Sequence, residues 1–146
     1  MEYDFDISHE NMGTILDWRL QYEYVKPLLV VGGEETARSD LMKKFGRNYF
    51  DNTIFTNIKN NAEIRNYINE HEPGRDMFFF LEKALADMIV PDETLLIFNN
   101  AHTCEGIWAL LKYVHDNDSN IYIAATGEFT EEQLAAAADY TMLLRL

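Results

Sequence analysis

The sequence has few of the residues that crosslink a chain, bind nucleic acid or span a membrane. Its 146 residues include one cysteine, Cys104, which excludes a disulfide framework within the chain and favours a reducing compartment. Only 12 residues are Lys or Arg against 25 Asp or Glu, and this net charge of −13 disfavours a nucleic-acid surface. No apolar run approaches the roughly 20 residues of a membrane span, and the acidic start MEYDFDISHE lacks the apolar segment of a secretory signal. We therefore expect a cytoplasmic protein that binds neither nucleic acid nor membrane.

The remaining composition is sufficient for a hydrophobic core. Hydrophobic residues make up 47% of the chain and aromatic residues 13%, which disfavours intrinsic disorder despite the charge. A chain of 146 residues also fits one domain. We expect residues 1–146 to form a single domain, in which the acidic residues 1–10 are a loosely ordered lead-in.

Short apolar segments alternate with helical patterns along the chain. Strands are predicted at residues 28–31, 53–56, 95–98, 121–125 and 140–146. Helices are predicted at residues 11–24, 41–45, 62–70, 77–88, 107–115 and 130–138. Gly46 is expected to end the second helix and Asp76 to cap the fourth, while Thr130 and Gln133 have the spacing of a capping box. The alternation predicts a three-layer α/β fold with a mostly parallel five-stranded sheet.

The first predicted strand is followed by a segment with the spacing of a phosphate-binding loop. In the pattern G-x-x-x-x-G-K-[ST], Gly32 and Ser39 occupy the first and last fixed positions. Ala37 replaces the second glycine and Arg38 replaces the lysine, while Gly33 follows the first glycine. Because ligands of parallel sheets bind beyond the carboxyl ends of the strands, this segment is a candidate nucleotide-binding loop in vestigial form.

Polar residues also follow the third and fourth predicted strands. Asn99 and Asn100 stand where a Walker B strand of an ATPase carries Asp and Glu. Thr126 follows the fourth strand, at the position of a polar sensor residue. These three residues therefore complete a candidate site at the same edge of the sheet.

The chain resembles the N-terminal nucleotide-binding core of a family of prokaryotic AAA-type ATPases, whose P-loop domain precedes a C-terminal domain of unknown function. The matching segments are residues 15–18, 26–30, 41–50, 94–98 and 111–125. The resemblance covers nearly the whole chain but only the core of a longer family protein. It implies a sheet of order 5-1-4-3-2, with the phosphate-binding loop after the central strand.

The loop substitutions oppose the binding of a polyphosphate. A Cβ at Ala37 disfavours positive φ and crowds a phosphate, and the planar fork of Arg38 does not substitute for an ammonium at a tight site. Glu34 and Glu35 place negative charge beside the phosphate position. Ser39 alone keeps its family role as a ligand of Mg²⁺.

The Walker B substitutions remove the catalytic carboxylates. Asn99 has the shape of Asp without its charge, and the neutral Asn100 cannot accept a proton from an attacking water. Loss of a general base typically costs roughly 10²–10⁴ in rate. We therefore expect no catalytic residues, no cofactor and no meaningful ATPase activity, with Mg-ATP as the alternative cofactor.

Three functional hypotheses follow. The first is a catalytically inactive pseudo-ATPase that serves as a binding or regulatory module for an unidentified protein partner. The second is an ATP- or GTP-binding protein that uses Arg38 and Ser39 and hydrolyses weakly or not at all. The third is an acidic interaction protein that engages a basic partner or mimics nucleic acid.

One further pair of residues suggests chemistry. His102 and Cys104 have the spacing of half a metal site or of a nucleophilic dyad, but no second ligand pair stands nearby and neighbours in one loop rarely reach attack geometry. We expect a loop histidine, a half-buried cysteine and no metal.

Overall fold

All five strands belong to one parallel sheet in the computed structural model, which describes residues 2–20, 25–117 and 120–146. The strands are β1 (Leu28–Val31), β2 (Asn52–Asn57), β3 (Thr94–Asn99), β4 (Tyr122–Thr126) and β5 (Met142–Arg145). Their order is β2-β3-β4-β1-β5, and every neighbouring pair is parallel. A sheet can be read from either edge, and from β5 this order is 5-1-4-3-2. The predicted α/β fold with a parallel sheet is confirmed.

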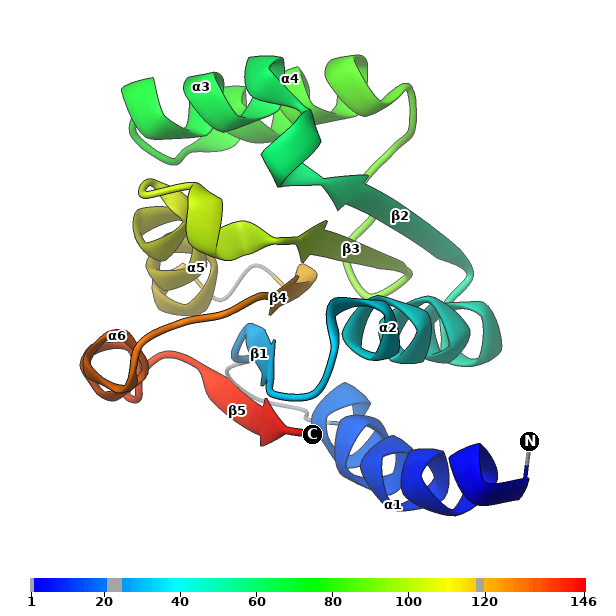
Figure 1. The fold of residues 1–146 in the computed structure, drawn as a ribbon. Coiled ribbons are helices and arrows are strands. Elements are labelled where there is room, and N and C mark those ends of the chain that lie inside the picture. The colour runs from blue at the N-terminus through cyan, green and yellow to red at the C-terminus, as the bar shows by residue number, and fades with distance from the viewer. Residues whose placement is uncertain (1, 21–24, 118–119) are drawn as a thin grey trace.

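Helices cover both faces of the sheet (Figure 1). The helices are α1 (Glu2–Arg19), α2 (Glu35–Tyr49), α3 (Ala62–Glu70), α4 (Arg75–Leu85), α5 (Ile107–Asp116) and α6 (Glu131–Ala136), with 3₁₀ turns η1 (Ile58–Asn60) and η2 (Ala101–Thr103). Side chains of α1 and α2 share one hydrophobic core with the sheet, and those of α3, α4, α5 and α6 share the other. Among the described residues, no helix is both long enough and apolar enough to cross a membrane.

The unbroken apolar runs of the strands follow from these two cores. In β1, Leu28 and Val30 pack towards α1 and α2, whereas Leu29 and Val31 pack towards the opposite helices. All four side chains of β1 are buried, because an interior parallel strand is covered on both faces. The position of β1 between β4 and β5 places the turn after it between the ends of those two strands.

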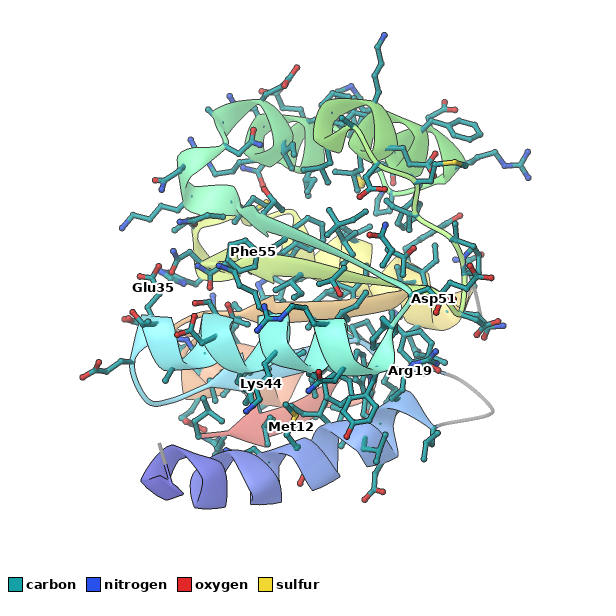
Figure 2. The ribbon with its side chains drawn as sticks, turned by 90° about the vertical axis from the view of Figure 1, so that its right-hand side faces the viewer. Met12, Arg19, Glu35, Lys44, Asp51 and Phe55 are labelled. Carbon is teal, nitrogen blue, oxygen red and sulfur yellow. The ribbon has the colours of Figure 1, made fainter. Side chains whose placement is uncertain are left out.

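Aromatic contacts fix the end of α1 against the sheet. The guanidinium carbon of Arg19 lies 4.3 Å from the ring centre of Phe50 and 4.8 Å from that of Tyr122. The Tyr122 hydroxyl donates to the Arg19 carbonyl at 2.9 Å, and the Trp18 indole donates to the Lys26 carbonyl. Figure 2 views this face, with Met12 and Arg19 on α1 and Lys44 on α2.

The first two helices differ from the sequence prediction. The backbone is already helical from Glu2, so α1 begins earlier than the predicted helix 11–24 and extends into the acidic residues 1–10, where no Pro or Gly interrupts it. The predicted end of this helix, residues 21–24, lies outside the described residues. Helix α2 runs from Glu35 to Tyr49 and includes Gly46, which was wrongly predicted to end it.

Other boundaries differ less. Helix α4 begins after Gly74, so Asp76 lies in its first turn and is not its cap. The predicted helix 77–88 ends at Leu85, where Ala86 adopts a left-handed conformation with φ 54°. The capping box of Thr130 and Gln133 is confirmed, since each side chain accepts a hydrogen bond from the backbone N–H of the other.

Gly46 is required for packing, because an added Cβ would overlap with the Thr53 hydroxyl and lie 2.6 Å from Thr53 Cγ2. The rigid, β-branched Thr53 belongs to β2 and has little freedom to move away. We predict that Gly46→Ala lowers the free energy of unfolding in urea by about 1–3 kcal/mol.

Gly13→Ala is the matched control for that substitution. Gly13 is an exposed helical residue of α1, and nothing lies within 4 Å of an added Cβ. Alanine there should leave stability unchanged or raise it by up to about 1 kcal/mol. Equal effects of the two substitutions would contradict the packing role of Gly46.

Candidate functional site

The turn between β1 and α2 is shorter than the phosphate-loop pattern predicts. Only Gly32, Gly33 and Glu34 separate the strand from the helix, because α2 already begins at Glu35. Both glycines have positive φ, +82° for Gly32 and +60° for Gly33, a conformation that favours glycine. The middle of the pattern is thus helical, and a wide loop of backbone amides is not formed there.

The later residues of the pattern are occupied with contacts inside the helix. Ala37, the residue at the second glycine position, is exposed in the first turn of α2. The Arg38 amide donates to the Glu34 carbonyl at 3.1 Å, which is the first hydrogen bond of the helix. The Ser39 side chain is 8% exposed, and its hydroxyl donates to the Thr36 carbonyl at 3.2 Å.

The Arg38 side chain contacts the turn that precedes α2. Its side chain is only 2% exposed, and Nη1 donates to the carbonyls of Gly32 at 3.0 Å and Gly33 at 3.1 Å. The turn therefore presents carbonyl oxygens to a cation. A phosphate-binding loop does the opposite, since it presents N–H groups to an anion.

Glu35 connects the start of α2 to the end of β3. Its Oε2 accepts hydrogen bonds from Asn100 Nδ2 at 3.0 Å and Asn99 Nδ2 at 3.3 Å. These are the two residues that the sequence predicts at Walker B positions, and both are at least 96% buried. In Figure 2, Glu35 lies at the N-terminal end of α2, on the side where the strands end.

The network continues to the two strands beside β3. Thr126, fully buried at the end of β4, donates to Asn99 Oδ1 at 2.6 Å. Asn100 also donates to Asn57 Oδ1 at 3.0 Å, at the end of β2. Asn100 has φ 56°, a left-handed conformation that Asn tolerates better than most residues. Four elements thus meet in one hydrogen-bonded cluster, which we call the Glu35 network (Glu35, Asn57, Asn99, Asn100 and Thr126).

The amide donors hold Glu35 as a carboxylate. The hydrogen bond from Asn100 lowers the pKa of Glu35 most, and the bond from Asn99 and the positive charges of Lys59 and Arg38 lower it further. Partial desolvation acts in the opposite direction. A carboxylate with a lowered pKa is a poor general base at neutral pH. The network is therefore suited to structural support more than to proton transfer.

The structure brings most of the predicted site residues to one end of the sheet. Asn99, Asn100 and Thr126 join the Glu35 network, whereas Gly32, Gly33 and Arg38 form a separate contact around the turn. Asn57 was missed, although its position after the second predicted strand is the signal that identified the others.

His102 and Cys104 face different partners. His102 Nδ1 accepts from the Glu128 amide at 3.1 Å, while Cys104 Sγ lies 3.3 Å from Asn69 Oδ1. Cys104 is 1% exposed, not half-buried as expected, and burial raises the pKa of its thiol to about 11. Within the described part of the chain, no three His, Cys, Asp or Glu side chains group together to hold a metal ion.

Removing the Asn100 amide should raise the pKa of Glu35. Because the folded-state pKa is lowered, Glu35 stabilises the fold above its ordinary pKa, and this contribution is lost as pH falls through the lowered value. We expect Asn100→Ala to move the Glu35 pKa towards its ordinary value, as measured by NMR titration of the side-chain carboxyl carbon.

Asn52→Ala is the control, because it removes an equivalent bond, from Asn52 Nδ2 to Asp87 at 3.0 Å, elsewhere in the chain. It should leave the Glu35 titration unchanged. An unchanged Glu35 pKa in Asn100→Ala would show that the amide does not hold the carboxylate.

Cys104 should be unreactive in the folded protein, because its thiolate is scarce below pH 11 and its sulfur is buried. We expect labelling by a thiol reagent at pH 8 to be slow under native conditions and fast in denaturant. Rapid native labelling would contradict the inert role of this cysteine.

Comparison with models of known protein families gives no match, and comparison with curated proteins gives none either. The turn around Arg38 and the Glu35 network therefore carry the functional argument by their geometry alone.

Proposed function

We propose that this chain is a cytoplasmic, catalytically inactive relative of P-loop ATPases that serves as a binding or regulatory module for a protein partner. The observation that carries the proposal is the pair of hydrogen bonds from Asn99 and Asn100 to Glu35. In a working ATPase, Walker B carboxylates organise Mg²⁺ and the attacking water beside the phosphates. Here a carboxylate of the chain itself accepts hydrogen bonds from both residues at those positions.

The geometry of the turn supports the same proposal. Phosphate binding needs N–H groups that converge on the ligand. Arg38, at the lysine position, is instead hydrogen-bonded to the carbonyls of Gly32 and Gly33. The hydroxyl of Ser39, which would bind Mg²⁺, is hydrogen-bonded to the backbone of its own helix. A nucleotide would have to break these contacts before it could bind.

The topology supports descent from a P-loop domain. The sheet order read from β5 is 5-1-4-3-2, the order that the resemblance implies, and the turn in question follows β1, which lies between β5 and β4. Polar residues end β3 and β4, as expected for Walker B and sensor residues, and this supports the proposal. In this proposal the P-loop fold is retained, and the catalytic carboxylates are replaced by polar residues that hydrogen-bond to one another.

A nucleotide titration tests the proposal. A ligand at 100 times its Kd raises the free energy of unfolding by about 2.7 kcal/mol, which a thermal-shift assay detects. We expect no shift with millimolar Mg-ATP, Mg-GTP or ADP relative to Mg²⁺ alone. Phosphate release should equal that of heat-denatured protein.

Ser39→Ala distinguishes the alternatives if a shift is seen. A nucleotide-dependent shift in the wild type that disappears in this variant would favour the second hypothesis, in which Ser39 binds the metal. Turnover above the denatured control would contradict the proposed loss of catalysis.

A further inference from the structure

A second potential site is lined by Arg38 and shares no residue with the Glu35 network. A cavity of about 350 Å³ opens at the carboxyl ends of β1, β4 and β5. Its lining combines apolar side chains, including Leu134 and Leu146, with the charged side chains of Arg38, Glu128, Glu131 and Arg145. This volume is at the lower end of the range for small-molecule pockets, so the site has room for a small ligand.

Arg38 lines this cavity and has unsatisfied hydrogen-bond donors. Its side chain is 98% buried, and Nε and Nη2 are both buried without a hydrogen-bond partner. Nη1 is already used by the carbonyls of Gly32 and Gly33. Nε and Nη2 form the edge of the guanidinium whose two N–H bonds run parallel, which matches the two oxygens of a carboxylate.

Buried donors without partners are rare in folded proteins, and a buried cation without a hydrogen-bonded anion is more unfavourable still. The nearest anionic group is Glu128, whose Oε2 lies 3.8 Å from Nη2, beyond hydrogen-bonding distance. The Glu128 side chain is 77% exposed, so solvent competes strongly for its carboxylate. Glu128 therefore lies near Nη2 of Arg38 without satisfying it.

We propose that the cavity binds a small monocarboxylate, whose two oxygens accept from Nε and Nη2 of Arg38. The ligand displaces the Glu128 side chain. Arg38 thereby loses a carboxylate beyond hydrogen-bonding distance and gains one that accepts hydrogen bonds from it directly. Its short apolar body packs against Leu134 and Leu146. The inference uses only the geometry around Arg38, so it stands independently of the proposed descent from an ATPase.

The charges of the cavity favour a monoanion over a phosphate. Arg145 donates to both oxygens of Glu131, at 3.1 Å and 2.9 Å, and is therefore already paired. Arg38 supplies the only remaining positive charge in the lining, while Glu128 adds a negative one. One bound carboxylate matches Arg38, whereas the second charge of a phosphate dianion has no cation to pair with and would be repelled by Glu128.

An NMR titration of the full chain tests this assignment. The probes are acetate, butyrate and benzoate, with chloride and inorganic phosphate as comparison anions. We expect saturable shifts of the Gly32, Gly33 and Gly127 amides with at least one monocarboxylate, and weaker binding of phosphate. Absence of saturation by all three carboxylates, or tighter binding of phosphate, would overturn the proposal.

Three variants make the test specific. Glu128→Gln removes the competing carboxylate from an exposed position and should tighten carboxylate binding several-fold. Glu132→Gln removes an equal charge at a residue that does not line the cavity, and it should leave the affinity for carboxylates unchanged. Arg38→Lys keeps the charge but lacks the parallel N–H edge, and it should abolish binding.

Equal affinities for Glu128→Gln and Glu132→Gln would overturn the role of Glu128, even if Arg38→Lys fails to fold. A Mg-ATP arm keeps the two proposals apart. Binding of Mg-ATP would contradict the proposed function, whereas failure of the carboxylates alone would contradict only the present inference.

Discussion

The carboxyl end of the sheet is organised around the buried guanidinium of Arg38. One of its nitrogen atoms, Nη1, holds the carbonyls of Gly32 and Gly33, and this contact fixes the turn between β1 and α2. The turn can close so tightly because both glycines adopt positive φ. A Cβ on Gly32 would lie 2.8 Å from the Leu146 carbonyl oxygen, so the close approach of the last residue of the chain also depends on glycine. The turn carbonyls and the Arg38 side chain therefore bind each other at the position where a phosphate loop would bind its ligand.

The same turn allows α2 to begin early. With only residues 32–34 between strand and helix, Glu35 lies beside the end of β3, where Asn99 and Asn100 donate to it. Two neutral amides satisfy one carboxylate, and Thr126 and Asn57 satisfy the amides in turn. A polar cluster of this kind is favourable because its hydrogen bonds are shared among its own members. Asn99 and Asn100 thus tie the end of β3 to the start of α2.

Much of the architecture could be predicted from the sequence, because β1, β3 and β4 are short apolar runs that only a sheet covered on both faces accommodates. The rule that parallel strands place their carboxyl ends together also identified Asn99, Asn100 and Thr126 as neighbours. The start of α2 was not predictable in the same way. The pattern at residues 32–39 suggested a loop, whereas α2 begins at Glu35 and Arg38 is hydrogen-bonded back to the turn.

Two other features that the sequence did not predict have a similar origin. Gly46 was predicted to end the helix because glycine commonly does so. In the structure it lies inside α2, and the absence of a side chain lets α2 pack closely against Thr53 of β2. The unpaired edge of Arg38 could not be inferred from residue type. An arginine in a phosphate-loop pattern indicates a positive charge, but it does not indicate which nitrogen atoms lack a hydrogen-bond partner. Such features depend on contacts between residues that are distant in sequence, and local patterns do not encode them.

The first turn of α2 anchors two parts of the molecule at once. Arg38 and Glu35 are three residues apart on one helix; Arg38 lines the cavity at the end of β5, and Glu35 binds the asparagines at the end of β3. The position of α2 is therefore fixed at its N-terminal end by contacts both to the turn after β1 and to the polar residues that follow β3.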